Sequence, residues 1–221
     1  MVANLCAVAW PKDQGAAHNW RGHDTALSQL QTGSPAGIAQ RVQLVTELAD
    51  SLQAGEVAVL PETVLPAADP RLLFASLLIE DAVEKLRDKG AVILVGTEIP
   101  LPGGKRRQNV LLPLGDASGP LVQRVPVPIG MWRPWSSESF TADLAGSGIG
   151  MVAGKQIAYS ICYEQGLVYP ILRSMVHRPA LLVGAANDWW ARSTSIPAIQ
   201  AQALNAWGRL FGVPVIRATN L

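Results

Sequence analysis

Short apolar runs alternate with longer amphipathic segments along the whole chain. Runs of four to six residues that are rich in Val, Ile and Leu predict strands, and they cover Leu5–Trp10, Val57–Leu60, Val92–Gly96, Val110–Leu114, Leu121–Val125, Ile157–Cys162, Leu181–Ala185 and Val213–Ala218. Segments with apolar residues every three to four positions predict helices, and they cover Gly37–Gln53, Arg71–Lys89, Leu167–His177 and Ala198–Phe211.

The order of these elements predicts an α/β fold. Strand and helix alternate as they do in a parallel sheet with crossover helices, whereas the strands on either side of "GDASGP" are typical of a hairpin. We therefore expect a mixed sheet. The 221 residues suit one domain, 1–221, in which the Pro- and Gly-containing stretches 100–104 and 126–150 are loops and not linkers.

Composition and charge limit the classes of function that the chain can have. Eighteen Lys and Arg face seventeen Asp and Glu, a net charge of +1, so nothing in the overall charge favours nucleic acid as a partner. The basic cluster Lys105-Arg106-Arg107 is interpreted as a solvated hairpin tip. Apolar runs stay far below the roughly 20 residues of a membrane span, and no signal-peptide pattern opens the sequence. The chain as given is expected to be soluble.

The cysteine and histidine patterns predict neither a disulfide framework nor a metal site. Cys6 and Cys162 lie in strand-like runs and are interpreted as free thiols. The three histidines lack metal-ligand spacing with the cysteines, and we expect no metal and no cofactor.

Polar residues follow three of the predicted strands. "VAVLPET" delivers Glu62, "AYSICYE" delivers Cys162 and Glu164, and "LLVGAANDWW" delivers Asn187 with Asp188. Ligands of open α/β sheets bind at the carboxyl ends of the strands, so these groups are candidates for one site.

Cys162 and Glu62 together suggest nucleophilic catalysis. A thiol with a pKa near 8.5 needs a base to become a nucleophile, and Glu62 is the candidate base. The N–H of Tyr163 is a natural donor to the oxyanion that attack on a carbonyl creates. Each residue also has a structural interpretation: core packing for the cysteine, a loop or first-turn charge for the glutamate, and an N-cap for the Asn187-Asp188 pair.

Five sequence blocks carry a family resemblance over nearly the whole chain. "LPETVLP", "VPIG", "GKQIAYSICYE", "NDWW" and "VPVIRATN", in that order, resemble the nitrilase superfamily of carbon–nitrogen hydrolases. Within it the chain is most similar to the apolipoprotein N-acyltransferase branch. The phrases "VPIGMWRPW" and "NAWGRLFGVP" resemble the related TraB proteins of plasmid conjugal transfer.

The resemblance implies an α-β-β-α sandwich with a Glu-Lys-Cys triad and a thioester acyl-enzyme. By position Glu62 matches the general base, Cys162 the nucleophile and Glu164 a supporting acid of the acyltransferase branch. The family lysine falls on Gln123, and a second expected glutamate falls on Met131.

Three other cations are candidates for the place of the lysine. Lys155 is seven residues before Cys162, roughly 23 Å away at about 3.3 Å per strand residue, and Lys105 lies in a Gly-rich loop. Arg124 is the remaining candidate for stabilising an oxyanion, provided that a bulge aims it where Gln123 would point. An arginine does not readily shuttle a proton.

Tryptophans surround these blocks. The resemblance places Trp132, Trp135, Trp189 and Trp190 around the mouth of the site, where with Tyr163 and Asn187 they would contact an acyl chain or a lipid-like group. The alternative is that they pack loops against the core.

The expected function is acyl transfer from an amide or ester, through a Cys162 thioester, to water or an amine, in plasmid conjugal transfer. The first alternative is a catalytically silent binding module in a transfer or membrane complex, which the missing lysine favours. The second is a small-molecule amidase of the cytoplasm. A homodimer, a C-terminal truncation, and a longer parent protein that places the domain near a membrane and faces the periplasm are further expectations.

Overall fold

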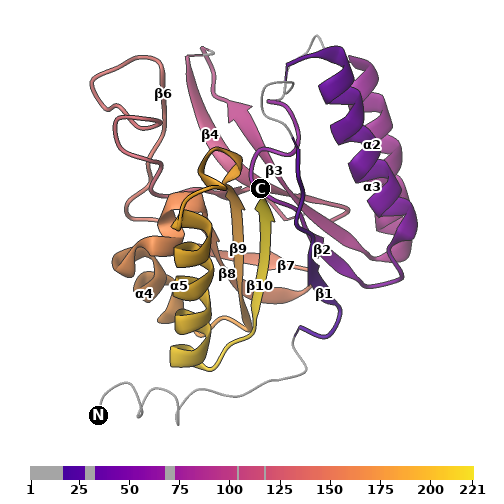
Figure 1. Ribbon diagram of the computed structural model, residues 1–221. Helices are drawn as coiled ribbons and strands as arrows, with labels where there is room; N and C mark the ends of the chain where they lie inside the picture. The colour runs from indigo at the N-terminus through magenta and orange to yellow at the C-terminus, as the bar shows by residue number, and fades with distance from the viewer. Residues whose placement is uncertain (1–16, 28–32, 68–72, 104, 117) are drawn as a thin grey trace.

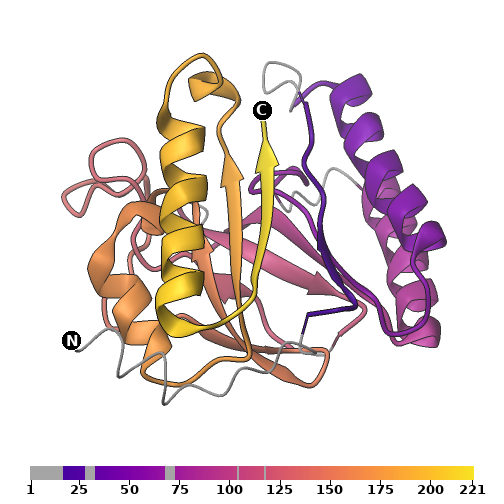
Figure 2. The same cartoon turned by 60° about the horizontal axis from the view of Figure 1, so that its bottom comes forward.

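Two β-sheets pack face to face, and a pair of helices covers the outer face of each sheet (Figure 1). The computed structural model describes residues 17–27, 33–67, 73–103, 105–116 and 118–221, without the side chains of 73–76. One sheet has six strands in the order β1-β2-β3-β4-β5, with β6 beside β4. The other has four strands in the order β10-β9-β8-β7. Figure 2 shows the two helix pairs on opposite sides of both sheets.

The strands of the six-stranded sheet are β1 (Trp20–Gly22), β2 (Val57–Val59), β3 (Val92–Pro100), β4 (Arg106–Leu114), β5 (Leu121–Val122) and β6 (Ser139–Phe140). Those of the four-stranded sheet are β7 (Ile149–Val152), β8 (Lys155–Ile161), β9 (Leu181–Asn187) and β10 (Val215–Asn220). The helices are α2 (Pro35–Ser51), α3 (Leu73–Lys89), α4 (Val168–Met175) and α5 (Ile196–Phe211), and two 3₁₀ turns are η2 (Cys162–Gly166) and η3 (Trp189–Ala191).

Alternation of side chains along each central strand builds the four layers. In β2, Val57 and Val59 enter the core between the sheets, whereas Ala58 packs against α2 and α3. In β9, Leu181 belongs to the same inter-sheet core and Leu182 packs under α4 and α5. Because both faces of these strands are covered, their sequences are continuous apolar runs.

The predicted α-β-β-α architecture is confirmed, with a few differences in the strands. The single mixed sheet expected from the order of elements is in fact two sheets. Three strands were not predicted, namely β1, β6 and β7, because each is at most four residues long and has few buried side chains. The predicted strand over Leu5–Trp10 lies outside the described residues. Among the described residues, no helix is long and apolar enough to cross a membrane.

The two sheets meet edge to edge at β1 and β10. A Cβ on Gly22 would lie 1.8 Å from the carbonyl oxygen of Arg217, so only glycine permits this approach. Beyond it, Thr25 bridges to Asn220, whose amide accepts from the N–H of Leu27 at 2.6 Å. The Asn220 Nδ2 also donates to Asn187 Oδ1 at 2.9 Å. This edge therefore fixes the end of β9, which lies beside β10 (Figure 2).

A buried arginine fastens α2 to the turn that follows β2. Arg41 is 1% exposed, and its Nη1 donates to the carbonyl oxygens of Thr63 at 3.1 Å and Val64 at 3.0 Å. Burial lowers the pKa of this guanidinium. Arg41 thus holds the backbone next to Glu62.

We expect Arg41→Met to lower the free energy of unfolding by about 2–3 kcal/mol, because two buried carbonyls lose their donor. Urea denaturation measures this loss. Arg87→Met, at an exposed position of α3, is the matched control and should change stability by no more than about 0.5 kcal/mol. Equal effects of the two substitutions would contradict the anchoring role.

Candidate active site

Three predicted site residues meet where the two sheets come together. Glu62 follows β2 of one sheet, Cys162 follows β8 of the other, and Asn187 ends β9. The N–H of Asn187 donates to Glu62 Oε2 at 3.1 Å, and the thiol of Cys162 donates to the same carboxylate. Glu62 is 5% exposed and Cys162 8% exposed. The predicted grouping of carboxylate and thiol at one rim is therefore present.

The turn that carries Glu62 lies directly on β3. A Cβ on Gly96 would come within 2.4 Å of the Glu62 Cα, so a glycine is required there. The N–H of Gly96 donates to the Pro61 carbonyl at 3.1 Å, and Thr63 has a positive φ of 53°. Thr63 Oγ1 then accepts from Asn187 Nδ2, which ties the turn to β9.

Cys162 occupies a strained junction between β8 and η2. Its φ of 50° lies in the left-handed region, which non-glycine residues rarely adopt. The sharp turn presents the side chain at the strand end, and the N–H of Tyr163 donates to its sulfur. Tyr163 therefore contributes its backbone to the site, while its side chain is 38% exposed.

Glu62 is poised to exchange a proton near neutral pH. Burial raises its pKa from 4.5 to about 7, although hydrogen bonds from Asn109, Cys162 and the N–H of Asn187 act in the opposite direction. The negative charge of Asp188 raises it further. A carboxylate with this pKa can both accept and return a proton at physiological pH.

The thiol of Cys162 is protonated at rest. Burial raises its pKa well above the usual value, and the charges of Glu62 and Asp188 and the hydrogen bond to Glu62 raise it further. Only the N–H of Tyr163 acts against them. Among the described residues, no lysine or arginine forms an ion pair with Glu62.

Gln123, at the position of the family lysine, belongs to a neutral hydrogen-bond chain. It is fully buried, and its Nε2 donates to the Ile161 carbonyl at 2.9 Å. Its Oε1 accepts from Asn109 Nδ2 at 2.9 Å, and the same amide group donates to Glu62 Oε1. These neutral amides thus connect Glu62, the candidate base, with Ile161, which precedes Cys162, and they introduce no charged group.

Arg124 points to the helix layer and not to the thiol. Its Nη1 donates to the Pro170 carbonyl at 3.0 Å and to Ser174 Oγ at 3.1 Å, and its Nη2 donates to the Tyr159 carbonyl at 3.3 Å. Neighbouring residues of an extended segment face opposite ways. Because Gln123 faces the site, Arg124 faces α4, and these contacts do not bring its guanidinium to the position of an oxyanion.

Glu164 braces the turn that carries Cys162. One oxygen accepts from the N–H groups of Arg124 at 2.6 Å and Val125 at 2.9 Å, and the other accepts from the N–H of Ile161 at 3.0 Å. The Nε of Arg124 lies 3.5 Å away, forming a buried ion pair. Burial raises the pKa of Glu164, and the charge of Arg124 opposes this shift. Glu164 thus orients backbone around the nucleophile.

Asp188, a candidate from its place after a strand, lies in the site, and Asn109 is a further site residue that the sequence did not single out. Asp188 is 1% exposed, and its charge acts on both Glu62 and Cys162. Burial raises its pKa, and the charge of Arg217 lowers it. It precedes η3, but its side chain makes no capping hydrogen bond. The available signal for Asn109 was a lone amide within the apolar strand "NVLLPL".

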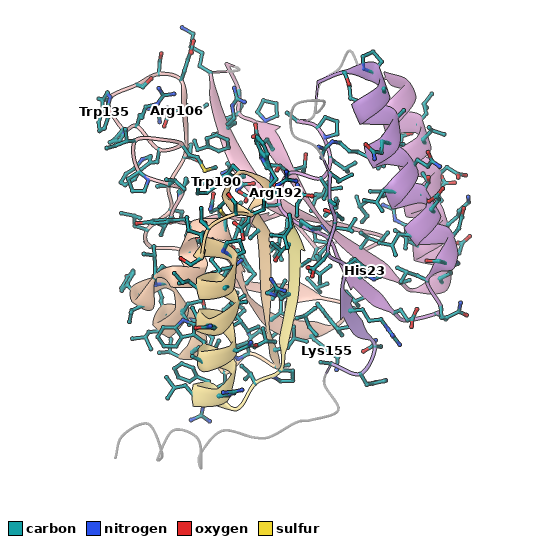
Figure 3. The ribbon with its side chains drawn as sticks, in the orientation of Figure 1. His23, Arg106, Trp135, Lys155, Trp190 and Arg192 are labelled. Carbon is teal, nitrogen blue, oxygen red and sulfur yellow. The ribbon has the colours of Figure 1, made fainter. Side chains whose placement is uncertain are left out.

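The four tryptophans do not form a single wall. Trp132 and Trp189 are half-buried, whereas Trp135 is 74% and Trp190 59% exposed. Figure 3 shows Trp190 near Arg192 above the end of β9, and Trp135 far from it on the loop of β6. Within the described residues, no group of three or more His, Cys, Asp or Glu is arranged to hold a metal ion.

Similar sequences are conjugal transfer proteins, and no family model matches the chain. The conjugal transfer protein TraB of Agrobacterium fabrum is 34% identical over 215 residues, which is 91% of this chain and 48% of that protein. The probable conjugal transfer protein TraB of Sinorhizobium fredii is 32% identical over 228 residues, 97% of this chain and 55% of that protein. The chain spans about half the length of these curated relatives.

Similar structures are amidases. A variant of the Nesterenkonia AN1 amidase from the nitrilase superfamily superimposes with a TM-score of 0.56 over 91% of this chain and 74% of that one, at 15% identity. Another variant, with the acetamide moiety of fluoroacetamide added covalently at its active site cysteine, gives a TM-score of 0.52 over 90% and 73%, at 14% identity. The chain is thus similar in sequence to about half of the TraB conjugal transfer proteins, and it has the fold of the solved nitrilase-superfamily amidases.

Proposed function

We propose that this domain transfers an acyl group through a thioester on Cys162. The observation that carries the proposal is the buried hydrogen bond from the Cys162 thiol to Glu62, beside the N–H of Tyr163. The solved amidase with a covalently modified active site cysteine has the same fold and supports this assignment.

In the proposed reaction Glu62 takes the proton of the thiol as the sulfur bonds to the carbonyl carbon of an amide or ester. The N–H of Tyr163 donates to the oxyanion that forms. When the intermediate collapses, the carbon–nitrogen or carbon–oxygen bond breaks, and Glu62 returns its proton to the leaving group. Water or an amine then attacks the thioester, gives a proton to Glu62, and the sulfur leaves with that proton.

The conjugal-transfer names of the relatives supply the proposed setting. We propose that the domain acts within a longer protein during plasmid transfer, on an acyl, amide or lipid-like substrate. N-acyl transfer, as in the acyltransferase branch, is the finer form of this proposal.

A silent binding module is the second candidate, and Gln123 favours it. A lysine near the thiol would stabilise the thiolate and the oxyanion, whereas the neutral amide of Gln123 does neither. Burial raises the pKa of Cys162, and the charges of Glu62 and Asp188 raise it further without a compensating cation.

We expect alkylation of Cys162 by iodoacetamide to accelerate as the pH rises through about 7, because Glu62 must lose its proton before it can accept one. Glu62→Gln should remove this step and slow alkylation about a hundredfold at pH ~8. Peptide mass spectrometry reads the rate, and Cys162→Ser, which retains Cys6, gives the background. Identical pH profiles for the parent protein and Glu62→Gln would reject acyl transfer in favour of the binding module.

The free energy of unfolding should also depend on the protonation state of Glu62, and it can be measured independently of catalytic activity. A pKa of about 7 in the folded state against 4.5 means that the contribution of Glu62 is full below pH 4.5 and is lost as the pH rises through 7. Between pH ~4 and ~8 the parent protein should lose about 3 kcal/mol relative to Glu62→Gln. Urea titrations at each pH measure the difference, with Glu84→Gln on exposed α3 as control. A constant difference would contradict the raised pKa.

Gln123→Lys should lower the pKa of Cys162, because an ammonium group close to an acid favours its charged form. Thiolate absorbance during a pH titration measures the shift, and Gln123→Met controls for the loss of the amide. An unchanged pKa in a folded Gln123→Lys variant would show that this position does not govern the thiol.

A further inference from the structure

An exposed edge of the molecule combines aromatic, aliphatic and basic side chains. We call it the hairpin edge. It comprises the tip of the β3–β4 hairpin with part of the loop between β5 and β6, namely Leu101, Pro102, Lys105, Arg106, Ile129, Arg133, Trp135 and Ser137. Figure 3 shows Trp135 and Arg106 at this edge.

The apolar members of the hairpin edge face solvent. Trp135 is 74% and Ile129 73% exposed, the two most exposed large apolar residues of this loop. A tryptophan buries much apolar area when it packs, so an indole left in water is unusual for a residue that serves the core. These side chains contribute little to folding and are available for a partner.

The charged members are mainly positive. Lys105, Arg106 and Arg133 are all exposed. Arg107 is excluded from this set, because it forms an ion pair with Glu98 at 3.0 Å and lies over the Phe140 ring. The exposed Glu138 is the acidic residue of the same loop.

A groove of about 460 Å³ runs between the hairpin tip and the loop, lined by Leu101, Pro102, Gly103, Lys105, Arg106 and Ser137. Its walls offer two cations and a hydroxyl, which match the oxygens of a phosphate ester. The apolar residues of the hairpin tip complete the lining.

Backbone pairing holds the two halves of the hairpin edge together. Arg106 is in register with Ser139 of β6, and the N–H of Leu101 donates to the Arg106 carbonyl at 2.8 Å. The N–H of Phe140 donates to the Met131 carbonyl at 3.0 Å, which closes the loop. The loop residues thus project from an anchored segment.

We propose that the hairpin edge docks on a membrane surface that contains anionic lipids. Tryptophan favours the boundary between headgroups and acyl chains, and lysine and arginine nearby are attracted by the negative surface. The groove takes one anionic headgroup while Trp135 and Ile129 enter the boundary. Three exposed cations are few for a nucleic acid, which is recognised mainly through many phosphate contacts. This surface is independent of the proposed chemistry at Cys162.

The test is co-flotation of the protein with vesicles of phosphatidylcholine alone or mixed with about one-third phosphatidylglycerol. We expect binding to the mixed vesicles that weakens as salt rises. Lys105→Gln with Arg106→Gln should weaken it about thirtyfold, since each basic residue near an anionic surface contributes several-fold. Trp135→Ala should weaken it at least about fivefold, because less apolar area enters the boundary.

The matched control is Arg87→Gln with Arg209→Gln, which removes the same charge from exposed positions on α3 and α5 and should leave vesicle binding unchanged. Cys162→Ser should bind as the parent does, so a failure of the acyl-transfer proposal leaves this test intact. Equal binding to both vesicle types, equal loss in the control, no flotation, or binding of free inorganic phosphate without vesicles would each overturn the proposal. Unfolding curves of every variant ensure that the compared proteins are folded.

Discussion

The burial of the Glu62 carboxylate between two stacked sheets is the constraint on which the site depends. Asn109 holds it from the six-stranded sheet, and the N–H of Asn187 and the thiol of Cys162 hold it from the four-stranded sheet. These partners converge only if β2 ends opposite β8 and β9. The inter-sheet core, made of alternate side chains of the same strands, sets that register. The packing of the inter-sheet core therefore also determines the geometry of the site.

Burial also explains the electrostatics of the site. Burial raises the pKa of Glu62 to about 7 and also raises the pKa of Cys162. Because both pKa values rise, proton transfer from the thiol to the carboxylate is less unfavourable than it would be if only the thiol were buried. Asp188 raises both values and adds negative charge. Gln123 keeps the hydrogen-bond chain complete but brings no cation. The arrangement retains a base and a nucleophile, and leaves the stabilisation of the thiolate mainly to the N–H of Tyr163.

Much of the fold was predictable from the sequence, because buried strands and amphipathic helices have distinct periods. The proximity of Glu62, Cys162 and Asn187 could be predicted, because the ligand-binding ends of the strands meet at one rim. The direction of the Arg124 side chain could not be predicted, because a change of one residue in register reverses the face on which a side chain lies. Asn109 was missed because its role arises from contacts over long sequence separations with Glu62 and Gln123, which neither composition nor periodicity reveals.

The site lowers the stability of the folded protein, and this loss bears on its function. A carboxylate with its pKa raised to about 7 destabilises the folded state at neutral pH, and a cysteine at a φ of 50° adds backbone strain. Glutamine in place of Glu62 would retain an acceptor for Asn109 without the buried charge, and glycine in place of Cys162 would relieve the strain. Stability alone thus favours neither residue. Their presence together, in hydrogen-bond contact, is what a thiol with an adjacent base requires, and it favours chemistry over a purely structural role.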